Sequence, residues 1–185
     1  MASSTTTRPT VPKEPVHYKT FEQNFVNDKT KQQTKDKIMV ITGVSTSDSI
    51  GYGVLRMMVS LETRCIVLTR NVEKAEKNIV SKLKEDVKNL ENPEKYIKFY
   101  PCDLSKFASV RSCGENIAKD LKAFPEFDIE TKKITFLVNN AGIAGHELRM
   151  TEDNNECQIQ VNHLSHFLLQ SYLQPFLNAS ERHIR

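Results

Sequence analysis

Four short apolar runs recur along the chain, and longer amphipathic segments separate them. The runs are IMVI at 38–41, CIVL at 65–68, IKFY at 97–100 and ITFLV at 134–138. Their apolar residues are largely continuous rather than alternating, which is typical of strands that are covered on both faces. Such strands occur mainly in parallel sheets, because helical crossovers pack on both sides of those sheets.

Two of the segments between these runs carry apolar residues at helical spacing. The first stripe consists of Ala75, Ile79, Val80, Leu83, Val87 and Leu90, and the second of Phe107, Val110, Ile117, Leu121 and Phe124. Each stripe gives its helix one apolar face to bury against a sheet. The alternation of strand and helix predicts an α/β fold with a doubly wound, Rossmann-like parallel sheet.

The stretch TGVSTSDSIGYG follows the first predicted strand and opens the next helix. In a doubly wound sheet this turn is where a pyrophosphate meets backbone N–H groups and a helix N-terminus, and glycines there let the phosphate approach the backbone. Gly43 and Gly51 are more widely spaced than is usual for this turn. The hydroxyls of Ser45, Ser47 and Ser49 would add donors to a phosphate or cap the helix. On these residues alone, an ordinary serine-rich turn is a nearly equal alternative.

Composition and charge argue against several other classes of function. The 185 residues suffice for one domain. The formal net charge is only +3, and 26 Lys and Arg are interspersed with 23 Asp and Glu, so no basic block favours nucleic acid. The four cysteines form no CxxC pair, which argues against a zinc or redox motif. No apolar stretch is long enough to span a bilayer, and the N-terminus lacks a secretory signal.

Residues 1–37 differ from the rest of the chain. They begin with MASSTTTRPTVPKEP and end with the polar stretch NDKTKQQTKDK, which has almost nothing to bury. This composition predicts a flexible N-terminal arm in front of a domain at 38–185, with Phe21 and Phe25 pinning one helical turn to that domain. The predicted location is cytoplasmic, and import into an organelle through the Ser- and Thr-rich arm stays open.

Three further stretches carry a family resemblance. They are CDLS at 102–105, LVNNAG at 137–142 and VNHLSHFLL at 161–169, each at or after a predicted strand end or in the helix that follows. In order and placement the chain resembles the short-chain dehydrogenase/reductases, particularly their retinol-dehydrogenase-like branch. The glycine-rich stretch is similar to the variant TGxxxxxSxG form of that family, so the resemblance implies a dinucleotide site.

The resemblance also implies roles for individual residues. The pyrophosphate would be held by Gly43, Ser49, Ile50 and Gly51, the adenine would contact Asp103 and Leu104, and the ribose would be lined by Asn140, Ala141 and Gly142. Val161 would lie near the nicotinamide, and Asn162 would hold a water in the proton relay of the reaction.

Several of these residues have simpler alternatives. Asp103 could cap a helix, and Asn140 could shape a turn. His163 and His166 are three residues apart, but no third ligand is suggested nearby, so no metal site is predicted.

The choice of cofactor depends on the residue after the second strand. An acid there favours NAD by accepting hydrogen bonds from the ribose hydroxyls, whereas an arginine can pair with the 2′-phosphate of NADP. The chain reads VLTRN, and Arg70 therefore predicts NADP, with a merely solvated arginine as the alternative.

Hydride transfer in this family requires a tyrosine, a lysine four residues later that lowers the tyrosine pKa, and a serine that fixes the substrate. The residues four positions after the five tyrosines are Glu22, Arg56, Tyr100, Leu104 and Phe176. None is a lysine. We therefore expect a chain truncated before the catalytic serine and the Tyr-x-x-x-Lys helix, which holds the N-terminal half of the fold with strand order 3-2-1-4.

Two functional hypotheses follow. The first is an NADP-dependent oxidoreductase that acts on a small carbonyl or alcohol substrate, represented here without its catalytic segment. The second is a non-catalytic dinucleotide-binding or interaction protein, such as a decoy subunit for full-length relatives. The apolar stripe on the helix at 157–177 would serve as core or as an interface in a homo- or hetero-oligomer.

Overall fold

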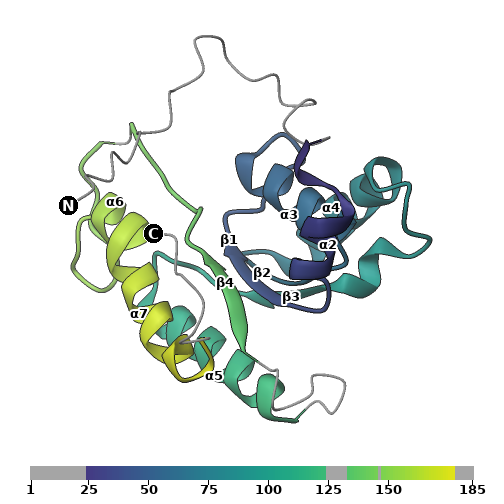
Figure 1. The fold of residues 1–185 in the computed structure, drawn as a ribbon. Helices are drawn as coiled ribbons and strands as arrows, with labels where there is room; N and C mark the ends of the chain where they lie inside the picture. Colours follow the sequence, from purple (N-terminus) through teal and green to yellow (C-terminus); the bar gives the residue numbers. More distant parts are fainter. Residues whose placement is uncertain (1–23, 124–132, 146, 178–185) are drawn as a thin grey trace, which may run out of the picture.

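A four-stranded parallel sheet forms the centre of the protein. The computed structural model describes residues 24–123, 133–145 and 147–177. The strands are β1 (Ile38–Thr42), β2 (Arg64–Thr69), β3 (Ile97–Pro101) and β4 (Ile134–Val138), in the order β3-β2-β1-β4 (Figure 1). All three pairings are parallel, and Val40 of β1 lies beside Ile66 of β2 and Leu137 of β4. The predicted strand order and fold class are confirmed.

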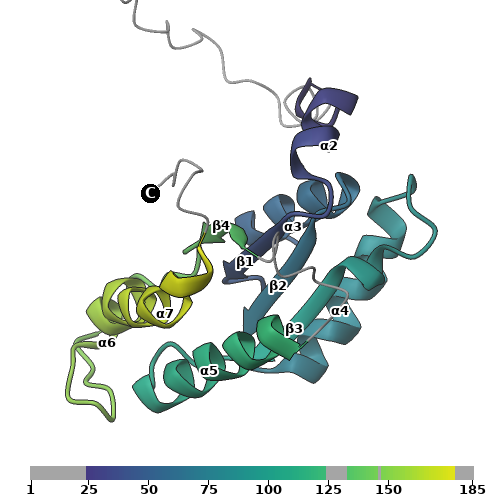
Figure 2. The ribbon, with the colours of Figure 1, turned by 60° about the horizontal axis from the view of Figure 1, so that its bottom comes forward.

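Helices cover both faces of this sheet (Figure 2). The longer ones are α2 (Asp28–Thr34), α3 (Ile50–Ser60), α4 (Val72–Asp86), α5 (Phe107–Ala123) and α7 (Ser165–Leu173). The short turns are η1 (Pro93–Tyr96), α6 (Cys157–Ile159), the π-helical η2 (Gln160–Leu164) and η3 (Gln174–Phe176). The first predicted stripe ends later than its helix, because Val87 caps α4 and Leu90 follows it. Phe124 of the second stripe lies outside the described residues.

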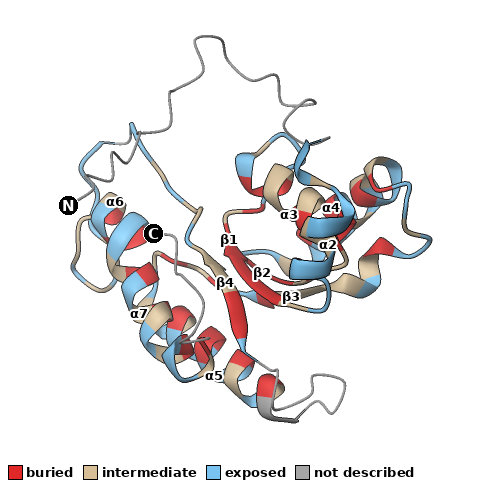
Figure 3. Cartoon of the chain, in the orientation of Figure 1, coloured by how far each residue is buried: buried red, intermediate tan, exposed pale blue. Residues whose placement is uncertain are grey.

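An apolar core lies on each face of the sheet, which explains why the strands have continuous runs of apolar residues. Toward α3 and α4 the strands direct Met39, Ile41, Cys65 and Val67, and toward α5 and α7 they direct Ile38, Val40, Ile66 and Leu68. Successive side chains of a strand point to opposite faces, so a strand between two helical layers must be apolar at every position. The two central strands β1 and β2 are accordingly among the most buried elements of the molecule, whereas β3 and β4 are partly exposed (Figure 3).

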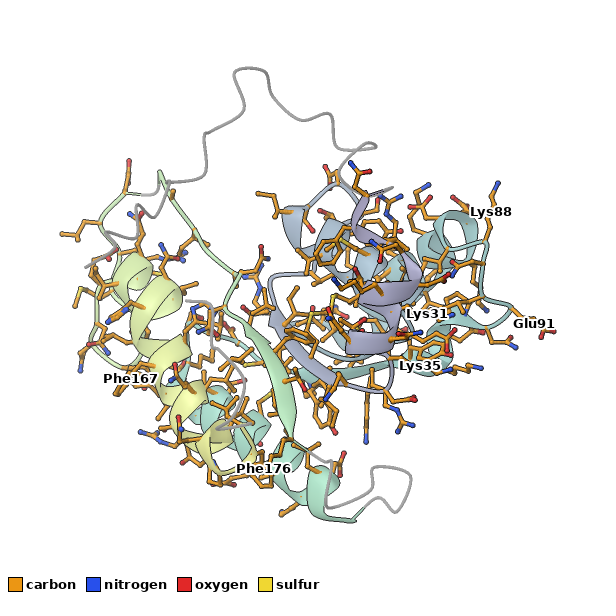
Figure 4. All side chains as sticks on the ribbon, viewed as in Figure 1. Lys31, Lys35, Lys88, Glu91, Phe167 and Phe176 are labelled. Atoms are coloured by element: carbon orange, nitrogen blue, oxygen red, sulfur yellow. The ribbon has the colours of Figure 1, made fainter. Side chains whose placement is uncertain are left out.

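The helix α2 belongs to the stretch that the sequence assigned to a flexible arm. Lys31 and Lys35 both form ion pairs with Glu62, the second at 3.0 Å (Figure 4). The Thr63 hydroxyl donates to the carbonyl oxygen of Thr34 at 3.1 Å. Residues 28–34 are thus a short helix held at the turn before β2. Residues 1–23 of the predicted arm, Phe21 among them, lie outside the described residues.

The segment after α7 returns to the sheet. Leu177 has an extended backbone and forms a parallel bridge with Ile134, the first residue of β4. The chain therefore passes along the side of β4 that faces away from β1. Among the residues that the structure describes, no helix combines the length and the apolarity needed to cross a membrane.

Candidate dinucleotide-binding site

The order of the strands creates a topological switch point between the carboxyl ends of β1 and β4. From β1 the chain crosses to β2 and then to β3, and only afterwards returns to the other side of β1 as β4. The segment after β1 leads to α3 on one face, and the segment after β4 leads toward α6 and α7 on the other (Figure 1). In open α/β sheets, ligands bind at such a switch point, outside the carboxyl ends of the strands.

Gly43 is where the two segments touch. Its φ of +77° is unfavourable for residues with a side chain, and a Cβ on it would lie 2.6 Å from the Cα of Ala141. The same added atom would lie 2.7 Å from the Nδ2 atom of Asn140. Gly43 therefore lets the turn after β4 pack directly on the turn after β1.

The Asn140 amide fills the space between the two glycines of the loop. Its Nδ2 donates to the carbonyl oxygens of Thr42 at 3.0 Å and Gly43 at 3.2 Å. A Cβ on Gly51 would lie 2.6 Å from that same nitrogen. We expected these glycines to make room for a phosphate. That role stays a prediction. The structure adds a second reason for their small size: a Cβ on either glycine would meet the Asn140 side chain, and one on Gly43 would also meet the Ala141 backbone.

The N-terminus of α3 offers backbone donors to an anion. Ser49 caps this helix: its hydroxyl accepts from the N–H of Tyr52 at 3.2 Å and donates to the carbonyl of Thr46 at 2.8 Å. The N–H groups of Ile50 and Gly51 have no hydrogen-bond partner among the described residues. Free N–H groups in the first turn of a helix are a common phosphate-binding arrangement.

The other predicted loop residues surround this helix start without closing it. Ser45 and Ser47 are exposed, and the side chain of Ile50 is 82% exposed. The sequence left two roles open for these hydroxyls, phosphate binding and helix capping. Ser49 caps α3. Ser45 and Ser47 remain accessible to a ligand.

A buried histidine connects the end of β1 to the helical segment after β4. The Nε2 atom of His166 lies 2.8 Å from the hydroxyl of Thr42, and its Nδ1 lies 3.2 Å from the carbonyl oxygen of Asn162. A carbonyl can only accept, so Nδ1 carries the proton and Nε2 accepts from Thr42. The Thr42 oxygen in turn accepts from the N–H of Ala141 at 3.0 Å. Burial lowers the pKa of His166 below its ordinary value of 6.5, which favours this neutral form.

Asn162 braces the segment after Gly142. Its Oδ1 accepts from the N–H of Ile143 and its Nδ2 donates to the carbonyl of Ile143, both at 2.8 Å. A Cβ on Gly142 would lie 3.6 Å from that Oδ1, so these residues are in contact range. Asn162 is exposed within the π-helical turn η2, whereas Val161 beside it is buried in the core below α7.

The remaining predicted residues lie at the carboxyl ends of β2 and β3. Arg70 is exposed directly after β2. Asp103 uses its Oδ1 to accept from the N–H and the hydroxyl of Ser105, at 2.9 and 2.7 Å, and so shapes the turn before α5. The first N–H of α5, at Phe107, donates to Asp153 instead of Asp103. Leu104 is buried with its side chain in the core. The carboxyl ends of the four strands, the start of α3 and η2 thus bring the predicted residues to one edge of the sheet.

Four residues important to this edge were missed from the sequence: Thr42, Gln160, Ser165 and His166. The contact between His166 and Asn162 could have been suspected from the sequence, because residues four apart lie on the same face of a helix. The contact between His166 and Thr42 of β1 could not, because 124 positions separate the two residues in the sequence. Among the described residues, no group of three or more His, Cys, Asp or Glu is arranged to hold a metal ion.

Fold and site together define a doubly wound α/β protein whose loops meet at a switch point. A family model described as short chain dehydrogenase matches residues 37–183. The chain therefore belongs to the short-chain dehydrogenase family.

Similar proteins include retinol dehydrogenase 12 of Homo sapiens, 32% identical over 82% of this chain and 42% of the relative. Human polyprenol dehydrogenase is 30% identical over 78% of this chain and 38% of the relative. The chain thus spans about two fifths of the length of the curated relatives it matches.

Solved structures share the fold. A metagenomic short-chain oxidoreductase in complex with NADP has a TM-score of 0.55 at 22% identity, covering 77% of this chain and 57% of that one. An NADPH-bound carbonyl reductase from chicken fatty liver has a TM-score of 0.51 at 18% identity, covering 77% of this chain and 52% of that one.

Proposed function

We propose that these residues form the cofactor-binding part of an NADP(H)-dependent short-chain dehydrogenase/reductase that interconverts a carbonyl and an alcohol. The observation that carries the proposal is the junction at the β1–β4 switch point, where Gly43 contacts the Asn140–Ala141 turn beside the open N-terminus of α3. A dinucleotide laid across this edge would meet the free N–H groups at the start of α3 with its pyrophosphate.

The proposal assigns the cofactor groups as follows. The pyrophosphate lies at Gly43, at the N–H groups of Ile50 and Gly51, and at the hydroxyls of Ser45, Ser47 and Ser49. Asp103 and the backbone of Leu104, whose side chain is buried in the core, face the adenine. Asn140, Ala141 and Gly142 line the ribose, and Val161 lies at the nicotinamide end. The bound nicotinamide supplies or accepts the hydride. Asn162 orients a water in the proton relay, and its amide keeps the segment after Gly142 in place while it does so.

The preference for NADP(H) is argued from Arg70. This guanidinium is exposed at the end of β2, where an acid would instead favour NAD. A guanidinium binds a phosphate with paired, charge-assisted hydrogen bonds. The NADP in the metagenomic oxidoreductase and the NADPH in the chicken carbonyl reductase are consistent with this preference.

The first prediction concerns this preference. Titration of the protein with NADPH and NADH should give tighter binding of NADPH by about tenfold or more, since hydrogen bonds between charged groups contribute roughly 1.5–3 kcal/mol. Arg70→Asp should abolish the difference. Lys88→Asp, the same charge change beyond the far end of α4, should retain it (Figure 4). Equal affinities for the two cofactors in the unaltered protein would contradict the assignment.

The substrate and partners are inferred from the family alone. A small carbonyl or alcohol compound is the proposed substrate class. Association through the helix at 157–177 is a further proposal, to which the 70% exposed side chain of Phe167 on α7 would contribute (Figure 4).

A further inference from the structure

The turn between β3 and α5 is internally braced. The N–H of Asp103 donates to the Ser109 hydroxyl at 2.9 Å, and the N–H of Lys106 donates to the carbonyl of Asp103 at 3.1 Å. Together with the bonds from Ser105 to the Asp103 carboxylate, these contacts set the shape of the turn. They do not set where the turn lies relative to the rest of the site.

A buried serine ties this turn to α7. Ser165, the first residue of α7, is fully buried, and its hydroxyl donates to the carbonyl oxygen of Leu104 at 2.6 Å. The two residues are 61 positions apart in the sequence. A buried hydroxyl and a buried carbonyl have no water to replace their partner, so this bond favours one position of the Leu104–Ser105 peptide.

A second tie holds the other end of the turn. Gln160, fully buried at the start of η2, donates through Nε2 to an Asp153 carboxylate oxygen at 2.7 Å. That same oxygen accepts from the N–H of Phe107, the first residue of α5, at 2.8 Å. The Phe107 N–H is the largest cause that holds the pKa of Asp153 below its ordinary value. Asp153 therefore caps α5 from a distant loop, and Gln160 fixes Asp153.

We propose that Ser165 and Gln160 are positioning residues of the adenine end of the cofactor site. They hold both ends of the 103–107 turn against the helical segment that also carries Asn162. One segment then fixes the distance between the adenine contacts and the proton-relay asparagine. This inference rests on the proposed function, because it takes Asp103 and Leu104 as the adenine contacts.

The chain contains a matched control for Ser165. Ser171 lies on the same helix, is exposed, and donates to the carbonyl of Leu168 at 2.7 Å, a bond within the helix itself. Ser165→Ala and Ser171→Ala make the same chemical change on α7. Only the first removes a contact to the 103–107 turn. Gln160→Met, which keeps the side-chain length without the amide, tests the second tie.

The experiment combines amide hydrogen exchange with binding of two probes, NADPH and its adenine half, 2′-phospho-ADP. Ser165→Ala and Gln160→Met should speed exchange of the amides at 103–107, while exchange at 43–53 stays as in the unaltered protein. Their affinity for 2′-phospho-ADP should fall about fivefold or more, as a buried acceptor loses its partner. Ser171→Ala should change neither quantity.

Faster exchange at 43–53 as well as 103–107 would overturn the inference, because it would indicate general destabilisation. Unchanged exchange at 103–107, or unchanged affinity for 2′-phospho-ADP, would also overturn it. If the unaltered protein binds neither probe, the proposed function fails, and the exchange data still decide whether Ser165 and Gln160 hold the turn.

Discussion

At the scale of single residues, His166 is the group whose chemistry is most constrained. Thr42 donates to its Nε2, and its Nδ1 donates to the carbonyl of Asn162. A proton added at Nε2 would face the Thr42 oxygen and leave the Thr42 hydroxyl proton without an acceptor. Burial is the largest cause that disfavours the charged imidazole, and nearby His163 acts in the same direction. The Thr42 hydrogen bond also favours the neutral ring, whereas the hydrogen bond to the Asn162 carbonyl favours the charged one.

Because the folded protein disfavours the charged form of His166, we predict that the protein loses stability in mild acid. In the unfolded chain the imidazole titrates near pH 6.5, whereas its pKa in the folded chain is lower. As the pH falls below about 6.5 the unfolded state binds the proton first, so the free energy of unfolding decreases, by about 1.4 kcal/mol for each unit of pKa lowering. Above that pH the full stability is present.

The measurement is denaturant unfolding at pH 7.5, 6.5 and 5.5. His166→Gln, which cannot be protonated, should flatten the dependence over this range. His163→Gln should retain it, because His166 is still present. An unaltered protein equally stable at all three pH values would show that His166 does not impose this linkage.

At the scale of elements, the turn after β1 and the turn after β4 pack on each other at the carboxyl end of the sheet. Gly43→Ala would force a Cβ to within 2.6 Å of the Ala141 backbone at a φ of +77°. We expect a loss of about 2–5 kcal/mol, from roughly 1–2 for the left-handed backbone and roughly 1–3 for overpacking. The loss is measurable as a lower midpoint of thermal unfolding.

Gly145 provides the control for this prediction. Its φ is +73°, and a Cβ on it would meet nothing within 4 Å. Gly145→Ala should therefore cost only the backbone term of about 1–2 kcal/mol. If both alanine variants lose the same stability, the close contact between the two turns does not contribute.

The elements differ in how far they could be predicted from the sequence. β1 and β2 have apolar side chains on both faces, so their continuous apolar runs were sufficient to predict them as buried strands. The helix α2 has almost nothing to bury, and its anchor is an ion-pair partner, Glu62, that local patterns do not reveal. The π-helical turn η2 was not predictable either, since it differs from an α-helix only in which carbonyl each N–H selects.

The candidate site divides in the same way. Glycines, Asn140 and Asp103 stand in recognisable motifs, and the structure brings them to one edge. Gln160 and Ser165 are polar residues in the core, whose partners become apparent only when distant segments pack together. Their positions in an apolar helix gave no indication of a contact to the 103–107 turn.

At the scale of the whole molecule, the prediction concerns turnover by the 185 residues present. None of the five tyrosines has a lysine four residues later. General acid–base catalysis contributes about 10²- to 10⁴-fold in rate, and the Asn162 amide does not exchange a proton near neutral pH. A polypeptide of these 185 residues should therefore not oxidise NADPH measurably with a panel of carbonyl compounds. Steady oxidation that Asn162→Ala abolishes would contradict this.

The central claim is that the switch point between β1 and β4 binds a dinucleotide. Its most direct test is amide hydrogen exchange of the protein with and without saturating NADPH. We predict protection at 43–53 and 139–143, which follow β1 and β4, and unchanged exchange at 87–96 beyond the far end of α4. Absence of saturable binding, or protection confined to segments away from the β1 and β4 turns, would contradict the account.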